Sequence, residues 1–163
     1  MVRLEQCDPV LCAVLREETC RLFEKAPIRF INRSRKFRNV GIAGDAGHFY
    51  SLRHEHCTPS MRTELSLLAP RLKNYELDRA YIHVFPPNSF IPAQRFSSEE
   101  HLAMAVVPLQ SSSVQGVTWY DAWDRAHHVI DGAGQALIFE NLSIVHAVRV
   151  VTQKRVSAVF LYR

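Results

Sequence analysis

The amino-acid sequence predicts an α+β fold in which a double-stranded β-helix, the jelly roll of cupin-like proteins, is braced by N-terminal helices. Helical periodicity is confined to the first part of the chain. From Ala80 onward, short apolar segments alternate with turns rich in Gly, Pro and Ser. Helices followed by many short strands are typical of an α+β chain built around a jelly roll. For 163 residues we expect a single domain, with residues 1–79 as helical support and first strands and residues 80–163 as the jelly-roll core.

Two helices are expected before Ala80, and each has a recognisable start. Asp8-Pro9 places an N-cap residue before a proline in the first turn, and the helix that follows should run to about Lys25. Thr58-Pro59 repeats this arrangement, and Pro70 marks the end of the second helix or a kink in it. Apolar residues at helical spacing support both helices: Leu11, Val14, Leu15 and Leu22 in the first, and Leu65, Leu68 and Leu72 in the second.

The expected strands of the core are residues 80–85, 90–94, 101–109, 116–120, 127–130, 135–139, 143–150 and 155–162. The segment 101–109 is apolar almost throughout, which predicts burial on both faces. Alternation in the last segment puts Arg155 and Ser157 on one face and Val156 on the other. The segment 37–52, where the first strands should lie, is ambiguous.

Composition and charge narrow the class of protein. A hydrophobic share of 47% and a net charge of +4 are ordinary for a globular chain. No apolar run approaches the roughly 18 residues that a membrane span needs, and residues 1–8 do not resemble a secretory signal. We therefore expect a cytoplasmic protein without a membrane partner, whose four cysteines are reduced thiols.

Basic residues cluster between positions 29 and 38, and they are Arg29, Arg33, Arg35, Lys36 and Arg38. No nucleic-acid-binding motif accompanies them, so a nucleic-acid partner is not favoured. A solvated loop or a charged edge strand is the favoured interpretation. Steering of an anionic substrate is a third possibility.

The face of the last strand that carries Arg155 and Ser157 is the main candidate binding site. A buried arginine and serine need a partner, and a carboxylate accepts from both the guanidinium and the hydroxyl. His146 can reach the same cavity from the preceding segment. The alternatives are an arginine paired with one of the chain's own acids and a histidine satisfied within the core. Tyr81, His83 and Trp119 are candidates for the pocket wall or for the core: the first two share a strand face, and aromatic rings commonly pack in either place.

Residues 80–163 also resemble a known superfamily. The resemblance is carried by Phe85-Pro-Pro-Asn-Ser-Phe-Ile-Pro-Ala-Gln-Arg-Phe96, by the segment 101–108, by Leu137-Ile-Phe-Glu-Asn141, and by His146 with Arg155 and Ser157. These segments resemble the Fe(II)/2-oxoglutarate-dependent oxygenases, closest to the aspartyl/asparaginyl β-hydroxylase and prolyl-hydroxylase-like branches. The resemblance implies Fe(II) and 2-oxoglutarate as cofactors. It implies His146 as the last iron ligand, Arg155 and Ser157 as the co-substrate clamp, and His101 as a histidine contacting the co-substrate.

The same motif departs from the family at its first metal-ligand pair. Gln94 stands where the first histidine belongs, and Phe96 stands where the acid or a glycine belongs. An amide oxygen is a weak, neutral ligand for divalent iron, and a phenyl ring is none. An alternative takes His101, followed by Ala103, as the first histidine of a His-x-small pair.

Three functions follow from these observations. The first is an oxygenase-fold protein with an incomplete iron site that binds a carboxylate-bearing small molecule. It would need no cofactor, and His146 or His101 would be the general acid/base of any non-oxidative reaction. The second is an active hydroxylase that holds Fe(II) through His146 with His101 or Gln94. The third is a non-catalytic binding module. The ligand count favours the first, and whether the chain is an enzyme stays open.

Overall fold

The computed structural model describes residues 1–33, 49–96 and 100–163. Its helices are α1 (Pro9–Lys25) and α2 (Pro59–Leu68), with short 3-10 turns at Pro27–Arg29 and His54–His56. Its strands are β1 (Val2–Gln6), β2 (Ile31–Asn32), β3 (Tyr50–Arg53), β4 (Leu77–Phe85), β5 (Ile91–Gln94), β6 (Ala103–Pro108), β7 (Gly116–Tyr120), β8 (Ala126–Ile130), β9 (Gln135–Phe139), β10 (His146–Val148) and β11 (Arg155–Tyr162). Most of the ambiguous segment 37–52 lies outside the described residues.

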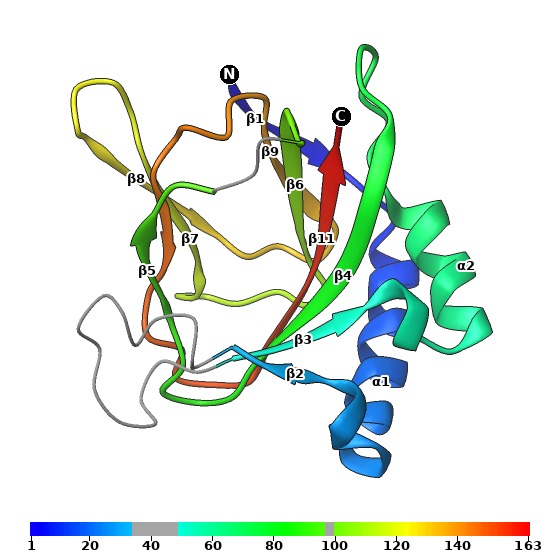
Figure 1. The fold of residues 1–163 in the computed structure, drawn as a ribbon. Coiled ribbons are helices and arrows are strands. Elements are labelled where there is room, and N and C mark those ends of the chain that lie inside the picture. Colours follow the sequence, from blue (N-terminus) through cyan, green and yellow to red (C-terminus); the bar gives the residue numbers. More distant parts are fainter. Residues whose placement is uncertain (34–48, 97–99) are drawn as a thin grey trace.

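The strands form two antiparallel sheets, which confirms the expected double-stranded β-helix. A seven-stranded sheet has the order β1-β9-β6-β11-β4-β3-β2, and a four-stranded sheet has the order β5-β10-β7-β8. Figure 1 shows the smaller sheet on one side of β4 and β11 and the two helices on the other. The helices therefore cover the outer face of the larger sheet, and the barrel interior lies on its inner face.

Both helices begin where the sequence predicts, because their caps satisfy the first backbone N–H groups. The carboxylate of Asp8 accepts from the backbone N–H of Val10 at 2.9 Å. The hydroxyl of Thr58 accepts from the backbone N–H of Met61 at 3.3 Å. The second helix ends at Leu68, shortly before Pro70. No helix in the described part of the chain is long and apolar enough to cross a membrane.

Strand β11 separates two hydrophobic cores. Its even-numbered residues Val156, Ala158, Phe160 and Tyr162 are buried in the core beneath the helices. Its odd-numbered residues Val159 and Leu161 belong to the core inside the barrel. The predicted alternation of this strand is therefore confirmed. All six residues of β6 are buried, as the apolar run 101–109 predicted.

Some strands differ from their predicted extents. Strand β1 was not predicted, and it pairs with β9 at the edge of the larger sheet. Strand β10 covers only 146–148 of the predicted 143–150. The preceding residues form a turn in which the side chain of Asn141 accepts from the backbone N–H and the hydroxyl of Ser143. A local side-chain hydrogen bond of this kind competes with strand pairing.

Two glutamates face each other between the helices. The Oε2 atoms of Glu18 on α1 and Glu64 on α2 are buried, and no other described residue gives either of them a hydrogen bond. Burial, together with the neighbouring carboxyl of Glu18, raises the pKa of Glu64 to about 7. Glu64 therefore keeps its proton in the folded state at pH values where the unfolded chain has lost it.

We expect the variant Glu64→Gln to be more stable than the natural chain above neutral pH. A carboxyl whose pKa is raised on folding stabilises the fold most below its ordinary value of 4.5, and this contribution falls as the pH rises to about 7. Thermal unfolding should show a higher melting temperature for the variant at about pH 8 and little difference at about pH 4. Glu17→Gln, on the exposed face of α1, is the matched control. An equal gain in melting temperature at both pH values would contradict the raised pKa of Glu64, because the effect would then not depend on its ionisation.

Candidate functional site

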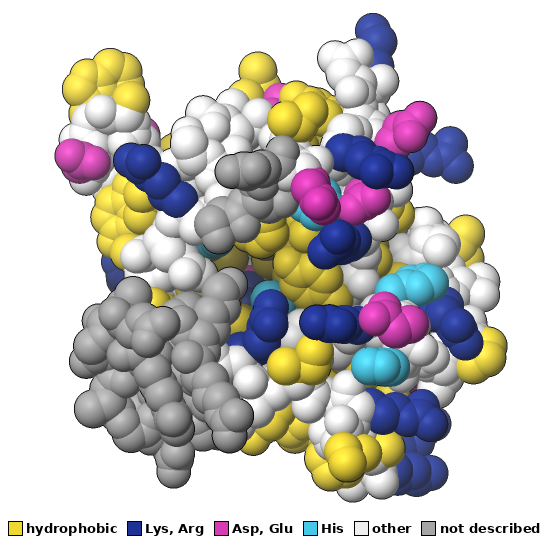
Figure 2. Space-filling view, in the orientation of Figure 1, with side chains coloured by type: hydrophobic (Ala, Val, Ile, Leu, Met, Phe, Trp, Pro, Cys, Tyr) yellow, Lys and Arg dark blue, Asp and Glu magenta, His cyan; other side chains and the backbone are white. Residues whose placement is uncertain are grey.

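A cavity of about 800 Å³ lies on the inner face of the larger sheet. It is bordered by β4 and β11 from that sheet and by β5 and β10 from the smaller one. The space-filling view in Figure 2 shows hydrophobic surface between groups of Lys and Arg side chains on this side of the molecule. The volume is that of a pocket for a small organic ligand.

His146 and Gln94 meet inside this pocket. Strand β10 lies between β5 and β7, and His146 is directly opposite Gln94 on one side and Trp119 on the other. Both His146 and Gln94 line the cavity. The Nδ1 atom of His146 lies 3.3 Å from the carbonyl oxygen of Ile144. Because a carbonyl oxygen only accepts, this contact is a hydrogen bond when the ring carries a proton on Nδ1.

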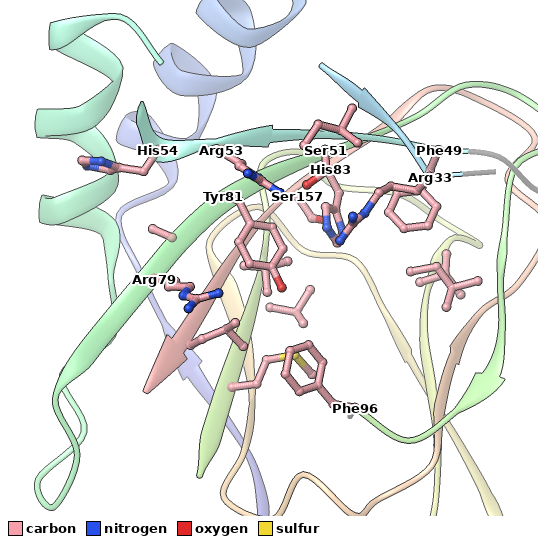
Figure 3. Close-up of a pocket in the computed structure, with 18 of the residues that line it drawn as sticks. Arg33, Phe49, Ser51, Arg53, His54, Arg79, Tyr81, His83, Phe96 and Ser157 are labelled. Carbon is pink, nitrogen blue, oxygen red and sulfur yellow. The ribbon is translucent and has the colours of Figure 1, made fainter. Parts of the chain in front are cut away.

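The two positions of the first metal-ligand pair both face the cavity. Phe96 lies two residues after Gln94 and also lines the pocket, where it packs against the inner core. Figure 3 shows the Phe96 ring at the border of the open space. Both positions thus line the same cavity as His146, but the side chains that occupy them are an amide and a phenyl ring.

Among the described residues, no group of three or more His, Cys, Asp or Glu side chains lies close enough to hold a metal ion. The donors at the expected place are one imidazole, from His146, and the amide of Gln94. Sites for divalent non-haem iron use two histidines and usually a carboxylate. Of the described residues at this place, Gln94 and Phe96 do not supply the further histidine and carboxylate that such an iron site would need beside His146.

Arg155 forms a buried, bidentate ion pair with Asp131. Its Nε donates to Oδ2 at 2.6 Å and its Nη2 donates to Oδ1 at 3.0 Å. The two side chains are only 1% and 2% exposed. Of the alternatives considered for Arg155, this is the pairing with one of the chain's own acids. A ligand carboxylate at this edge of the guanidinium would have to compete with Asp131.

The rest of the Arg155 side chain faces the pocket. Its Nη1 lies 3.4 Å from the hydroxyl of Ser157, and its guanidinium carbon is 5.2 Å from the centre of the Phe85 ring. Both Arg155 and Ser157 line the cavity. The role of these two residues as a co-substrate clamp remains a prediction, and one edge of the clamp is already occupied.

A row of polar side chains crosses the larger sheet beside this pair. Ser51 on β3, His83 on β4 and Ser157 on β11 are register partners, and all three line the cavity. The ring of His83 lies 4.8 Å from Phe49 and 5.0 Å from Tyr81, centre to centre. His83 and Tyr81, two of the three predicted wall residues, therefore lie together in the pocket.

Tyr81 is a neutral hydrogen-bond donor in this setting. Burial raises the pKa of its phenol to about 12, against the opposing effect of nearby Arg33 and Arg79. Trp119, the third predicted wall residue, is not among the described residues that line the cavity. It packs against the inner core and stacks on His127 with ring centres 4.3 Å apart.

The structure does not bring His101 to His146. Its Nε2 lies 2.7 Å from Oδ2 of Asp78, and its side chain is 2% exposed. The hydrogen bond to His101 lowers the pKa of the Asp78 carboxyl, with Arg163 and Arg79 contributing. His101 precedes β6, and it is not one of the described residues that line the cavity. Through this contact with Asp78, the His101 side chain links the segment before β6 to the start of β4.

Arginines on the pocket wall are the main feature that motif reasoning missed. The cavity is also lined by Arg33, Arg53, Arg79 and Arg95. Only Arg33 belongs to the basic segment 29–38, for which steering of an anion was one interpretation. Arg35, Lys36 and Arg38 lie outside the described residues.

Comparison with solved structures identifies the fold. A prolyl-4-hydroxylase of Pseudomonas putida is similar over 99% of this chain and 92% of its own, with 15% identity and a TM-score of 0.70. A Trichoplax adhaerens prolyl hydroxylase, solved with a peptide of hypoxia inducible factor, is similar over 99% and 82%, with 10% identity and a TM-score of 0.68. The non-haem α-ketoglutarate-dependent carbocyclase SnoK of nogalamycin biosynthesis is similar over 99% and 78%, with 13% identity and a TM-score of 0.70.

No protein-family model matches the chain, and no curated protein matches it. The structural likenesses nevertheless confirm the resemblance to the Fe(II)/2-oxoglutarate oxygenase superfamily at the level of fold. Fold alone does not assign a reaction, so function has to be argued from the residues of the pocket.

Proposed function

We propose that this chain is an oxygenase-fold protein with an incomplete iron site, whose barrel pocket binds a small molecule bearing a carboxylate. The observation that carries the proposal is the pairing of His146 with Gln94 across β10 and β5. An amide stands where the superfamily resemblance places the first histidine, and Phe96 fills the neighbouring position. The pocket is retained, whereas the donor set for iron is not.

His146 is the residue best placed for chemistry in such a pocket. Imidazole titrates near neutrality and serves as a general acid or base without a metal. When Nδ1 carries a proton, it donates to the carbonyl of Ile144, and the ring is held by its own turn. Reactions that need only proton transfer, such as isomerisation, cyclisation or elimination, suit this arrangement. The pocket, lined by Ser157 and several arginines, suits an acid as substrate.

Metal analysis of the natural chain beside the double variant Gln94→His, Phe96→Asp tests the proposal. Both proteins are incubated anaerobically with Fe(II) and 2-oxoglutarate, desalted, and assayed for bound iron and for the visible charge-transfer band. We expect iron near one equivalent in the double variant only, because the two new donors complete a site with His146.

A second double variant, Gln94→Asn, Phe96→Leu, changes the same positions without adding donors and should bind no iron. Stoichiometric iron in the natural chain, together with formation of succinate from 2-oxoglutarate, would overturn the incomplete site and favour the active hydroxylase. Absence of iron from the double variant would show that these positions do not face His146 as the register indicates.

A further inference from the structure

We propose that the wall of the pocket formed by β2, β3 and the start of β4 is an anion receptor centred on Arg33 and Arg53. Its ligand is a small organic acid, a carboxylate or a phosphate, with a flat apolar body. The inference rests on the proposed function, since the ligand occupies the same pocket, and it places the acid group away from Arg155.

The pairing of charges around the pocket favours this wall as the place where an anion binds. Arg155 is neutralised by Asp131, and Arg79 lies 3.4 Å from Asp78 and 3.3 Å from Glu100. By contrast, Arg33 and Arg53 form no ion pair with any acid in residues 1–33, 49–96 and 100–163, although both line the cavity. Two guanidinium groups without an acidic partner among the described residues attract an anion, and each can donate two hydrogen bonds to its oxygens.

Arg33 also has a buried donor that lacks an acceptor. Its Nε is shielded from solvent and makes no hydrogen bond to any described residue. A buried N–H group without an acceptor is unfavourable, and a bound anion would satisfy it. The backbone fixes the position, because the N–H of Arg33 donates to the carbonyl of Phe49 at 2.8 Å.

The neighbouring side chains add hydrogen-bond donors of the right kind. Arg53 is the register partner of Tyr81 across β3 and β4, and Ser51 is the partner of His83. Burial raises the pKa of the Tyr81 phenol further, to about 12, so its hydroxyl stays protonated and can donate a hydrogen bond. Figure 3 shows Arg33 and Arg79 reaching from opposite sides toward the space beside the Tyr81 ring.

The rest of the pocket defines the body of the ligand. Phe49 and Phe85 stack with ring centres 5.0 Å apart, and Phe96 borders the cavity from the other sheet. Apolar side chains from the inner core continue this surface toward β10: Met104, Val106, Val117, Val148 and Val159. A cavity of about 800 Å³ with such walls suits a ring-bearing acid better than a short, fully polar diacid.

Calorimetric titration of the metal-free chain with matched probes tests the receptor. The probes are naphthoate, naphthyl phosphate, the neutral naphthalene methanol, and acetate, which has the charge without the ring. We expect one or both naphthyl acids to bind at least about tenfold more tightly than the other two probes. Tighter binding of the carboxylate or of the phosphate identifies the natural acid group.

Arginine variants locate the anion. Arg33→Gln and Arg53→Gln should each lower the affinity for the preferred naphthyl acid by about tenfold to hundredfold, because each removes a charge-assisted hydrogen bond. Arg21→Gln, on the exposed face of α1 and away from the cavity, should change the affinity by less than about threefold. If a variant does not fold, the affinity of the natural chain must still fall as salt is raised.

Three results would overturn the receptor. The first is equal binding of the neutral and acidic naphthyl probes, and the second is full affinity in both Arg33→Gln and Arg53→Gln. The third is no binding of any acid. The second result would leave the proposed function intact, with the acid group elsewhere in the pocket. Iron binding by the natural chain would contradict the proposed function. The arginine variants would still show whether the anion binds at Arg33 and Arg53.

Discussion

Replacing Asp131 with alanine should destabilise the fold by about 3–5 kcal/mol, because it leaves the Arg155 guanidinium buried without a counter-ion. Both side chains of this pair are almost fully buried, and two hydrogen bonds join them. Urea unfolding followed by circular dichroism measures the loss, which should appear as a lower midpoint at an unchanged slope. A high concentration of acetate should restore part of the lost stability by supplying the missing carboxylate.

The double variant Asp131→Ala, Arg155→Met separates the pair from the packing around it. Removing both charges should recover much of the lost stability, since an apolar side chain of similar length replaces the arginine. A loss below about 1 kcal/mol in Asp131→Ala would contradict this account, because it would show that solvent reaches the guanidinium.

The second large effect is expected at Phe160. Its side chain is fully buried in the core beneath the helices. Phe160→Ala should cost about 3–5 kcal/mol, the loss of apolar burial together with the cavity left behind. The same urea titration measures it, and hydrogen exchange should report faster opening of α1 and α2.

Val159→Ala is the matched control on the opposite face of the same strand. It removes less apolar surface, from a wall that borders an existing cavity, so we expect a loss of about 1–2 kcal/mol. Equal losses at the two positions would contradict the division of β11 between a helical core and a pocket wall.

The parts of the fold that were predictable from the sequence have local signals. The helix starts at Asp8 and Thr58 are capping patterns, and the bounds of β7, β9 and β11 follow from apolar segments between turn residues. Strand β1 lacks such a signal, because its charged residues alternate at the edge of the sheet. Strand β4 begins three residues before the predicted start at Ala80, since its first residues lie toward solvent.

The candidate site was predictable to the extent that it rests on motif order. The pairing of Gln94 with His146 follows from the family pattern. The partner of Arg155 does not, because Asp131 is distant in sequence and a lone acid after β8 has no distinctive pattern. The same holds for His101, because its neighbours in the sequence give no hint of a pairing with Asp78. Arg53 and Arg79 become pocket residues only when β3 and β4 pair.

The Arg155–Asp131 pair affects how the stability of the fold depends on the concentration of small acids in solution. A protein whose buried cation is satisfied only by a metabolite gains stability with the logarithm of the concentration of that metabolite. Here the counter-ion is covalently part of the chain, at a fixed and saturating local concentration. The buried charge of Arg155 is therefore satisfied without any bound small acid.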